Sequence, residues 1–437
     1  MVKAEKRWLT ISLVNLSIVA LLGTLLRSKI LFPLPGINFG NLLHAHSHFA
    51  FSGWVTLCLL ALIVYELLPP DLSRKRVYTW LLAGMLLSAN GMLLSFPFQG
   101  YGPVSITFST LLIFVSYAFS WVLIKDLSRS AISRPVKILL YTALAALVAS
   151  SAGPFTLAYV MASHHGNAVL YRNAIYTYLH LQYNGFFTLG VLALFAHQLS
   201  AHDHTAVARN LYRFAVILSF SVWPTLCLSY LWNTPNILVR TMAMAGSISL
   251  VVTLVWFIAL IRSSKVMLDT VSPFAKKVGA LALMAFVFKT ALQAATVLPV
   301  VGNIAFGNRP VIIGYLHLVL LGFITLYLLA CLVHKGYFQT GEHLAKVGIC
   351  ILTGAIVVNE VILMLQGLSP ILPLYSAGYP WLLWGAAIGL LTGTVTIVAA
   401  AARQGSEVLP LKDADRHYQR EHRPAAHTNN RVYTASH

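Results

Sequence analysis

Runs of about 20 apolar residues recur along this chain, and this recurrence limits its fold more than any other feature, because a helix of that length crosses a bilayer. Hydrophobic residues make up 58% of the 437 residues and charged residues only 10%. About a quarter of an ordinary globular chain is charged, so this chain cannot cover itself with a water-soluble surface. We therefore predict an all-α, polytopic membrane bundle.

Twelve such runs are found, and they fill residues 1–402 without leaving room for a second domain. The predicted spans are 8–26, 46–68, 77–97, 103–124, 136–162, 173–199, 211–231, 240–261, 278–298, 311–334, 346–367 and 379–402. The remaining residues, 403–437, are polar and mixed in charge, which favours a disordered cytoplasmic tail.

The basic residues are sorted by the connection in which they lie. Of 30 Lys and Arg residues, 24 fall in the N-terminus, the even-numbered connections and the tail, and five fall in the odd-numbered connections. This bias predicts that both termini are cytoplasmic. The net charge of +18 is then explained by topology, and no nucleic-acid partner is expected.

Three histidine motifs stand out in the second, sixth and tenth spans. Each contains a His followed five residues later by Gly: His48 with Gly53, His180 with Gly185, and His317 with Gly322. The latter two motifs share the segment Tyr-Leu-His-Leu, and the three histidines are 132 and 137 residues apart. One motif for every four spans predicts three pseudo-repeated four-helix arcs. The Gly leaves space for a flat macrocycle or for a neighbouring helix.

All three motif helices enter from the same side, so their histidines lie at a similar depth near the outer face. Neutral imidazole is the commonest protein ligand for haem iron and other transition metals. Two more histidines, His44 and His46, precede His48. His44 and His48 are one turn apart and share a face, as metal-binding pairs do, so with His180 they are the candidate metal ligands. Because His46 points away from them, at most two of the three should enter one site. The alternative is that each histidine only packs or bonds within the bundle.

These features together resemble those of a known family of membrane proteins. Twelve spans with histidines on spans 2, 6 and 10 resemble the large subunit of haem-copper oxidases and nitric oxide reductases. The segment His-Ser-His-Phe-Ala-Phe-Ser-Gly, at residues 46–53, is also similar to NnrS-type haem-copper membrane proteins. The resemblance implies a bacterial inner-membrane protein, and an oxidoreductase if the chain is catalytic. It also implies a redox partner protein or quinol, and possible accessory subunits that are missing here.

Carried over by position, the resemblance implies a low-spin haem b with His317 on one face. The other face would be bound by a second-span histidine, in the order of preference His48, His46, His44. His180 would match a copper ligand, and either His44 or His46, or the loop residues at 164–165, could complete a copper site of another kind. The chain departs from the family where Tyr315 replaces the ligand of the high-spin haem and where the seventh span lacks histidines. We therefore expect electron transfer or chemistry related to O2 or nitric oxide, without a complete binuclear centre.

A few polar residues inside the spans complete the candidate site. Lys289 and Glu360 are predicted near mid-bilayer, where a lone charge is costly, so they should pair with each other or line a hydrated path. Gln293 and Asn359 could extend a proton route or simply hold two helices together. Of the outer basic residues, Arg27, Arg172, Arg240 and Arg309, the last is the preferred partner for haem propionates because it precedes the helix of His317.

Two other functions compete with haem binding. Twelve spans are common among secondary transporters, in which Lys289 and Glu360 would be coupling residues, but the repeat found here is of four spans rather than six. A non-haem copper or zinc protein would keep the histidines without the haem. An optical spectrum with metal analysis separates these hypotheses from the first.

Overall fold

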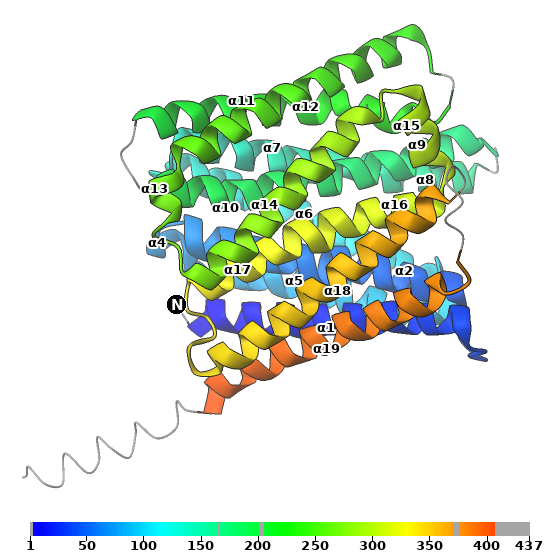
Figure 1. The fold of residues 1–437 in the computed structure, drawn as a ribbon, viewed down its shortest axis with the longest axis horizontal. Coiled ribbons are helices and arrows are strands. Elements are labelled where there is room, and N and C mark those ends of the chain that lie inside the picture. Colours follow the sequence, from blue (N-terminus) through cyan, green and yellow to red (C-terminus); the bar gives the residue numbers. More distant parts are fainter. Residues whose placement is uncertain (1–2, 164–165, 201–204, 234, 370–375, 407–437) are drawn as a thin grey trace, which may run out of the picture.

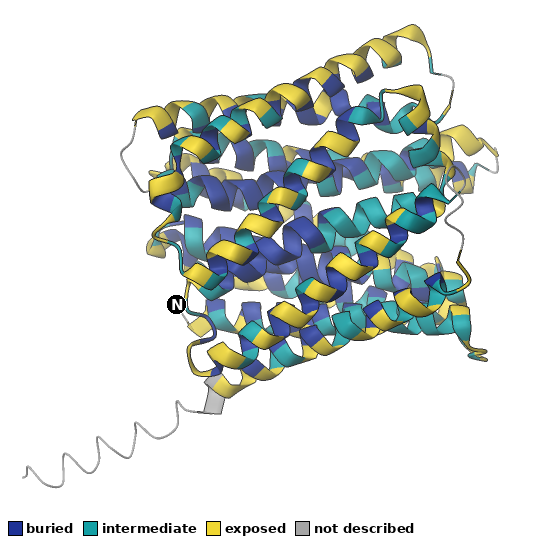
Figure 2. Ribbon diagram, viewed as in Figure 1, coloured by how far each residue is buried: buried dark blue, intermediate teal, exposed yellow. Residues whose placement is uncertain are grey.

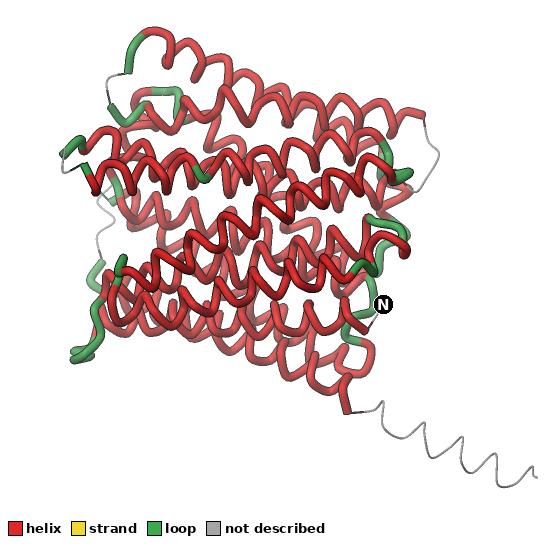
Figure 3. Tube along the Cα trace, turned by 180° about the vertical axis from the view of Figure 1, so that it is seen from behind, coloured by secondary structure: helices red, strands yellow, loops and turns green. Residues whose placement is uncertain are grey.

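A computed structural model describes residues 3–163, 166–200, 205–233, 235–369 and 376–406. Twelve of its helices are long and apolar enough to cross a membrane, as predicted, and no strand occurs in the described ranges. Figure 3 shows the all-helical trace. The twelve are α1 (Lys3–Leu31), α2 to η2 (Phe39–Leu67), α5 (Arg76–Gln99), α6 (Pro103–Arg129), α7 with α8 (Arg134–Ala162), α9 to α10 (Ala168–Ser200), α11 with η4 (Thr205–Tyr230), α12 (Ile237–Ser263), α14 (Pro273–Ala295), α16 to α17 (Arg309–His334), η6 with α18 (Gln339–Leu368) and α19 (Tyr379–Ser406).

Most helices extend beyond the predicted apolar runs, because polar residues continue the helical turns at the ends. Two spans are also interrupted within the bundle. The fifth divides at Ser151 into α7 (Arg134–Ser150) and α8 (Ala152–Ala162), and the seventh tightens after Pro224 into the 3-10 segment η4 (Leu226–Tyr230). The tail beyond residue 406 and the loop residues 164–165 lie outside the described residues.

The first and last helices of the bundle lie side by side. Figure 1 shows α1 and α19 along one edge, with the N-terminus and the end of α19 at the same end of the bundle. Hydrogen bonds join them, from the Trp384 indole to Ser28 Oγ at 2.9 Å and from Thr24 Oγ1 to the Ala387 carbonyl at 3.1 Å. The helix α18 packs closely on α19 because Gly348 and Gly393 have no side chains at the crossing.

The three helices with histidine motifs form the core of the bundle. The shares of buried residues in the most apolar parts of spans 2, 6 and 10 are 89%, 89% and 67%, whereas the other nine spans range from 22% to 56%. Figure 2 shows this gradient as dark central helices behind yellow outer ones. The motif helices are therefore the ones least in contact with lipid.

Each motif helix changes to a π-helical segment at its motif histidine or within two residues after it. These segments are η1 (Ala50–Thr56), η3 (His180–Phe187) and η5 (Leu318–Thr325), and each contains the Gly of the motif. The segment η5 contacts both η1 and η3. Widening from i→i+4 to i→i+5 bonding is rare and concentrates at functional sites, so the motif marks a structural irregularity common to all three helices.

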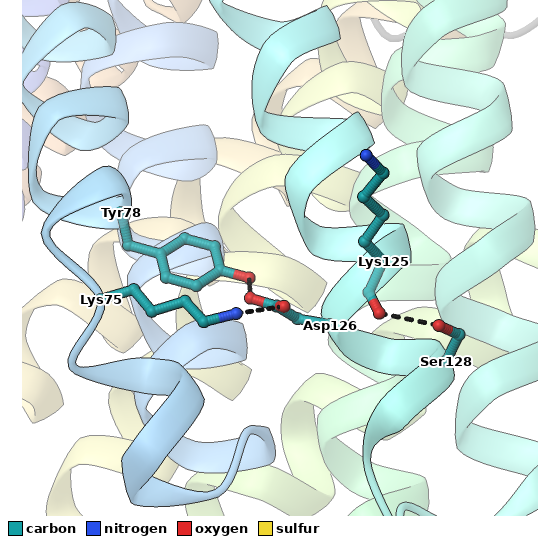
Figure 4. Close-up of polar contacts among 5 residues, drawn as sticks. All are labelled: Lys75, Tyr78, Lys125, Asp126 and Ser128. Atoms are coloured by element: carbon teal, nitrogen blue, oxygen red, sulfur yellow. Dashed lines mark hydrogen bonds and ion pairs between the residues drawn. The ribbon is translucent and has the colours of Figure 1, made fainter.

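The two ends of the bundle differ in chemistry. We call the end with the start of α1 and the end of α19 the basic end, and the opposite end, with residues 32–38 and 100–102, the histidine end. At the basic end, the buried Asp126 of α6 accepts hydrogen bonds from Lys75 at 2.5 Å and from the Tyr78 hydroxyl at 2.9 Å (Figure 4). Lys335 pairs there with Glu66. These contacts tie the helix ends together on that side.

Candidate haem site

His46 faces α1, away from the other two histidines of α2 (Phe39–Phe49). Its Nδ1 lies 3.1 Å from the Val19 carbonyl, and since a carbonyl only accepts, His46 donates this bond and keeps its Nε2 lone pair free. A Cβ on Gly23 of α1 would lie 3.2 Å from the His46 ring, so this Gly gives the imidazole its space. Backbone bonding at Nδ1 is the usual way to orient a ligand imidazole.

His317, at the end of α16 (Arg309–His317), has no hydrogen-bond partner among the described residues. Its Nδ1 is fully buried, and leaving a buried polar atom unpaired costs about 1–3 kcal/mol. The groups that act on it electrostatically are His46 and Arg27. His317 in span 10 therefore lies within electrostatic range of His46 in span 2 and of the half-buried guanidinium of Arg27.

His44 and His48 form a second group on the opposite face of α2. The Nε2 atom of His48 lies 3.0 Å from the Tyr101 hydroxyl, and its ring stacks on Phe96 at a centroid distance of 4.6 Å. The His44 ring meets the Tyr101 ring edge-on at 4.6 Å. The prediction that at most two of the three histidines enter one site agrees with this division. Of the histidines in span 2, it is His46 that acts electrostatically on His317.

His180 is fully engaged by protein atoms. Its Nε2 donates to the Val222 carbonyl at 2.9 Å, and its Nδ1 accepts from the Asn184 amide at 3.2 Å. Neither ring nitrogen is free for copper in this conformation. The described part of the chain contains no group of three or more His, Cys, Asp or Glu side chains that could hold a metal, so His44, His48 and His180 do not share a site.

Lys289 is buried beside His180 rather than paired with Glu360. Its ammonium donates to Asn184 Oδ1 at 2.9 Å and lies 3.5 Å from Thr188 Oγ1. The described residues contain no ion pair between Lys289 and Glu360, so the predicted pairing of these two residues is not seen. Asn184 therefore connects a cation to an imidazole inside the bundle.

The other polar candidates lie near this cluster without forming a continuous row. Glu360 accepts from the Asn359 amide at 3.0 Å and lies against Gly314 of α16. The Tyr315 hydroxyl is 3.5 Å from Gln293 Oε1, and its ring meets that of Tyr183 at 5.9 Å. These contacts link helices α14, α16 and α18. They do not join Lys289 to Glu360 in one hydrogen-bonded chain.

The glycines of the motifs serve protein packing in at least two cases. A Cβ on Gly185 would lie 2.5 Å from the Ala146 side chain of α7, so this Gly admits a neighbouring helix. A Cβ on Gly53 would lie 2.6 Å from the Phe49 ring, and its carbonyl accepts a 2.7 Å bond from Asn15 of α1. Of the two predicted uses for these glycines, the close approach of helices is the one seen at Gly185.

Arginine positions favour a residue that the sequence did not rank first. Arg309 begins α16 and is exposed, eight residues before His317. Arg27 is half-buried in α1 and acts electrostatically on both His46 and His317. In the sequence, Arg27 was notable only as one of the few basic residues predicted on the outer side. The packing of α1 against α2 places it within electrostatic range of His46 and His317.

The fold defines a polytopic, all-helical membrane protein with twelve candidate spans. No protein-family model and no curated protein matches the chain.

Proposed function

We propose that this chain is a haem b-containing membrane redox protein that holds its haem between His46 and His317. The observation that carries the proposal is the unpaired imidazole of His317 beside a His46 whose free Nε2 is oriented by the Val19 carbonyl. Two neutral imidazoles on separate helices suit a six-coordinate iron. The unsatisfied buried nitrogen is the kind of defect that a bound group or a water removes.

Different residues have different roles in the proposed site. His46 and His317 would bind the haem iron through imidazole nitrogens, and the Val19 carbonyl fixes the tautomer of His46. Arg27 supplies positive charge for the haem carboxylates, which guanidinium groups bind well. When bound, a haem with two histidine ligands supplies one-electron transfer and leaves no open position for a diatomic gas. We therefore propose electron transfer, to or from a redox protein or quinol, rather than oxygen reduction.

Oxidase-type catalysis is not part of the proposal for two reasons. The expected ligand of a high-spin haem is Tyr315, and His180 uses both ring nitrogens within the protein. The similar motif helices still favour three four-helix arcs with a common origin, because all three carry a π-helical segment at the motif histidine or within two residues after it. The basic bias favours cytoplasmic termini, which would put the haem near the outer face.

An optical spectrum of the purified protein tests the proposal. We expect a Soret band and a reduced low-spin α band at about one haem per chain, typical of a bis-histidine site. His317→Ala should lose the haem while remaining helical by circular dichroism, because Nδ1 of His317 has no protein bond to lose. Protein purified with a supply of haem that shows no Soret band would contradict the proposal.

A non-haem metal site is the second candidate, supported by one observation. His44 and His48 lie one turn apart against Tyr101, an arrangement that offers two imidazoles and a hydroxyl to copper or zinc. Metal analysis decides between the candidates, since copper or zinc without haem, lost on His44→Ala, would favour this one.

A further inference from the structure

A lateral groove opens at the basic end of the bundle, and none of the motif histidines lines it. It has a volume of about 440 Å3 and lies between α12 and α14, with α10 (Thr188–Ser200) and α17 (Leu326–His334) behind it. Apolar residues form its walls: Phe257, Ile258, Leu283, Met284 and Val287. Ile258 and Met284 are 43% and 62% exposed, so the groove faces the surrounding lipid.

The polar groups of the groove gather at one end. Arg262 lies in the last turn of α12 and Lys276 in the first turn of α14, both at the basic end. From Lys276 to Val287 the helix rises about 16 Å at 1.5 Å per residue. One leaflet of a ~30 Å hydrocarbon core is about 15 Å thick. The groove therefore matches a ligand with a polar head at the interface and a chain one leaflet long.

The charged residues that line the groove favour an anionic head group. The lining residues include Arg262 and Lys276 but no Asp or Glu. Lys276 is paired with Asp269 of the adjoining loop, whereas no ion pair or hydrogen bond joins Arg262 to another described residue. A free guanidinium at the lipid interface is well suited to a phosphate, which it can bind through two parallel hydrogen bonds.

We infer that this groove is a binding site for an anionic phospholipid of the leaflet at the basic end. The phosphate binds Arg262, and one acyl chain lies along α14 over Gly279. That glycine keeps the groove open, since a Cβ there would have only Ala330 at 3.7 Å as its nearest contact. Basic pockets between membrane helices are typical sites for such head groups. The inference is independent of haem binding, because none of the residues that line the groove is a proposed haem ligand.

Native mass spectrometry of the delipidated protein tests the inference with phosphatidylglycerol and phosphatidylcholine that carry the same acyl chains. We expect wild type to prefer phosphatidylglycerol about fivefold, the contribution of one basic residue near a charged lipid surface. Arg262→Gln should remove the preference. The matched control is Arg74→Gln, since Arg74 is exposed at the same end and does not line the groove.

A second variant tests the shape of the groove separately from its charge. Gly279→Leu should fill it and weaken the binding of both lipids, while thermal unfolding in lipid-free detergent and haem content remain as in wild type. Equal binding of the two lipids to wild type, or a preference that survives Arg262→Gln, would overturn the inference. So would an equal loss in Arg74→Gln, or displacement of phosphatidylglycerol by an equimolar short-chain quinone.

Discussion

His180 and His317 occupy the same sequence motif, Tyr-Leu-His-Leu, at the start of similar π-helical segments, yet their surroundings are opposite. The ring of His180 is bonded at both nitrogens, to Val222 and Asn184. The ring of His317 has no hydrogen-bond partner in the described part of the chain, and its Nδ1 is buried. A repeated motif therefore fixes where an imidazole lies in a helix but not what it does there.

The difference comes from the neighbouring helices. Beside His180, the Val222 carbonyl lies in the last turn of α11 (Thr205–Thr225), where it accepts the imidazole hydrogen bond. Beside His317, the neighbours are another histidine and an arginine. Protein atoms satisfy the ring of His180, whereas the described residues leave the buried Nδ1 of His317 unpaired.

The largest expected effect separates His46 from His48. His46→Ala should lower the haem content by more than about tenfold, since loss of an outer partner of a metal ligand alone costs 10–100-fold. His48→Ala should retain haem, because its ring is bonded to Tyr101 instead. Haem per chain, from the pyridine haemochrome, measures both. If the His48 variant alone loses haem, His48 rather than His46 is the haem ligand.

Removing the Asn184 side chain should strongly destabilise the folded protein, because Asn184 bonds both His180 and Lys289 inside the bundle. Asn184→Ala leaves the buried Lys289 without its main acceptor, and an unsatisfied buried charged group costs more than the about 1–3 kcal/mol of a neutral one. Denaturation in detergent, followed by near-ultraviolet circular dichroism, measures the loss. Adding Lys289→Met removes the unpaired charge, so the double variant should be more stable than Asn184→Ala. Equal stability of the two would show that Lys289 carries no buried charge.

Replacing His180 should cost less, because no full charge is left unpaired. His180→Phe leaves the Val222 carbonyl and the Asn184 amide without this partner, a loss of about 1–3 kcal/mol. Haem content should stay unchanged, in contrast to His317→Ala. If wild type holds copper and this variant alone loses it, His180 is a metal ligand after all.

The smallest effect concerns the link between spans 2 and 10. The Trp54 indole donates to Thr325 Oγ1 at 2.9 Å, joining the helices that carry His46 and His317. Thr325→Val should lower stability by about 1 kcal/mol, the usual net value of such a bond. Trp54→Phe alone should cost more through lost packing. In a double-mutant cycle the two changes should be non-additive, and additivity would show that the bond contributes nothing.

Much of the architecture could be predicted from the chain. Apolar runs gave all twelve spans, because each helix must bury its own backbone bonds in lipid. The helical period placed His46 opposite His44 and His48, since residues two apart on a helix point in different directions. The same reasoning could not rank His46 above His48, because period alone does not say which helix covers each face.

The sequence by itself determined that this is a multi-span membrane protein whose motif helices differ from the rest. Spacing, apolar length and charge act locally, so they can be read along the chain. Only the tertiary structure decided that Asn184, Val222 and Lys289 surround His180, whereas His46 and Arg27 approach His317. Hydrogen bonds and charges act over a few ångströms between helices far apart in sequence, and only packing brings them within reach.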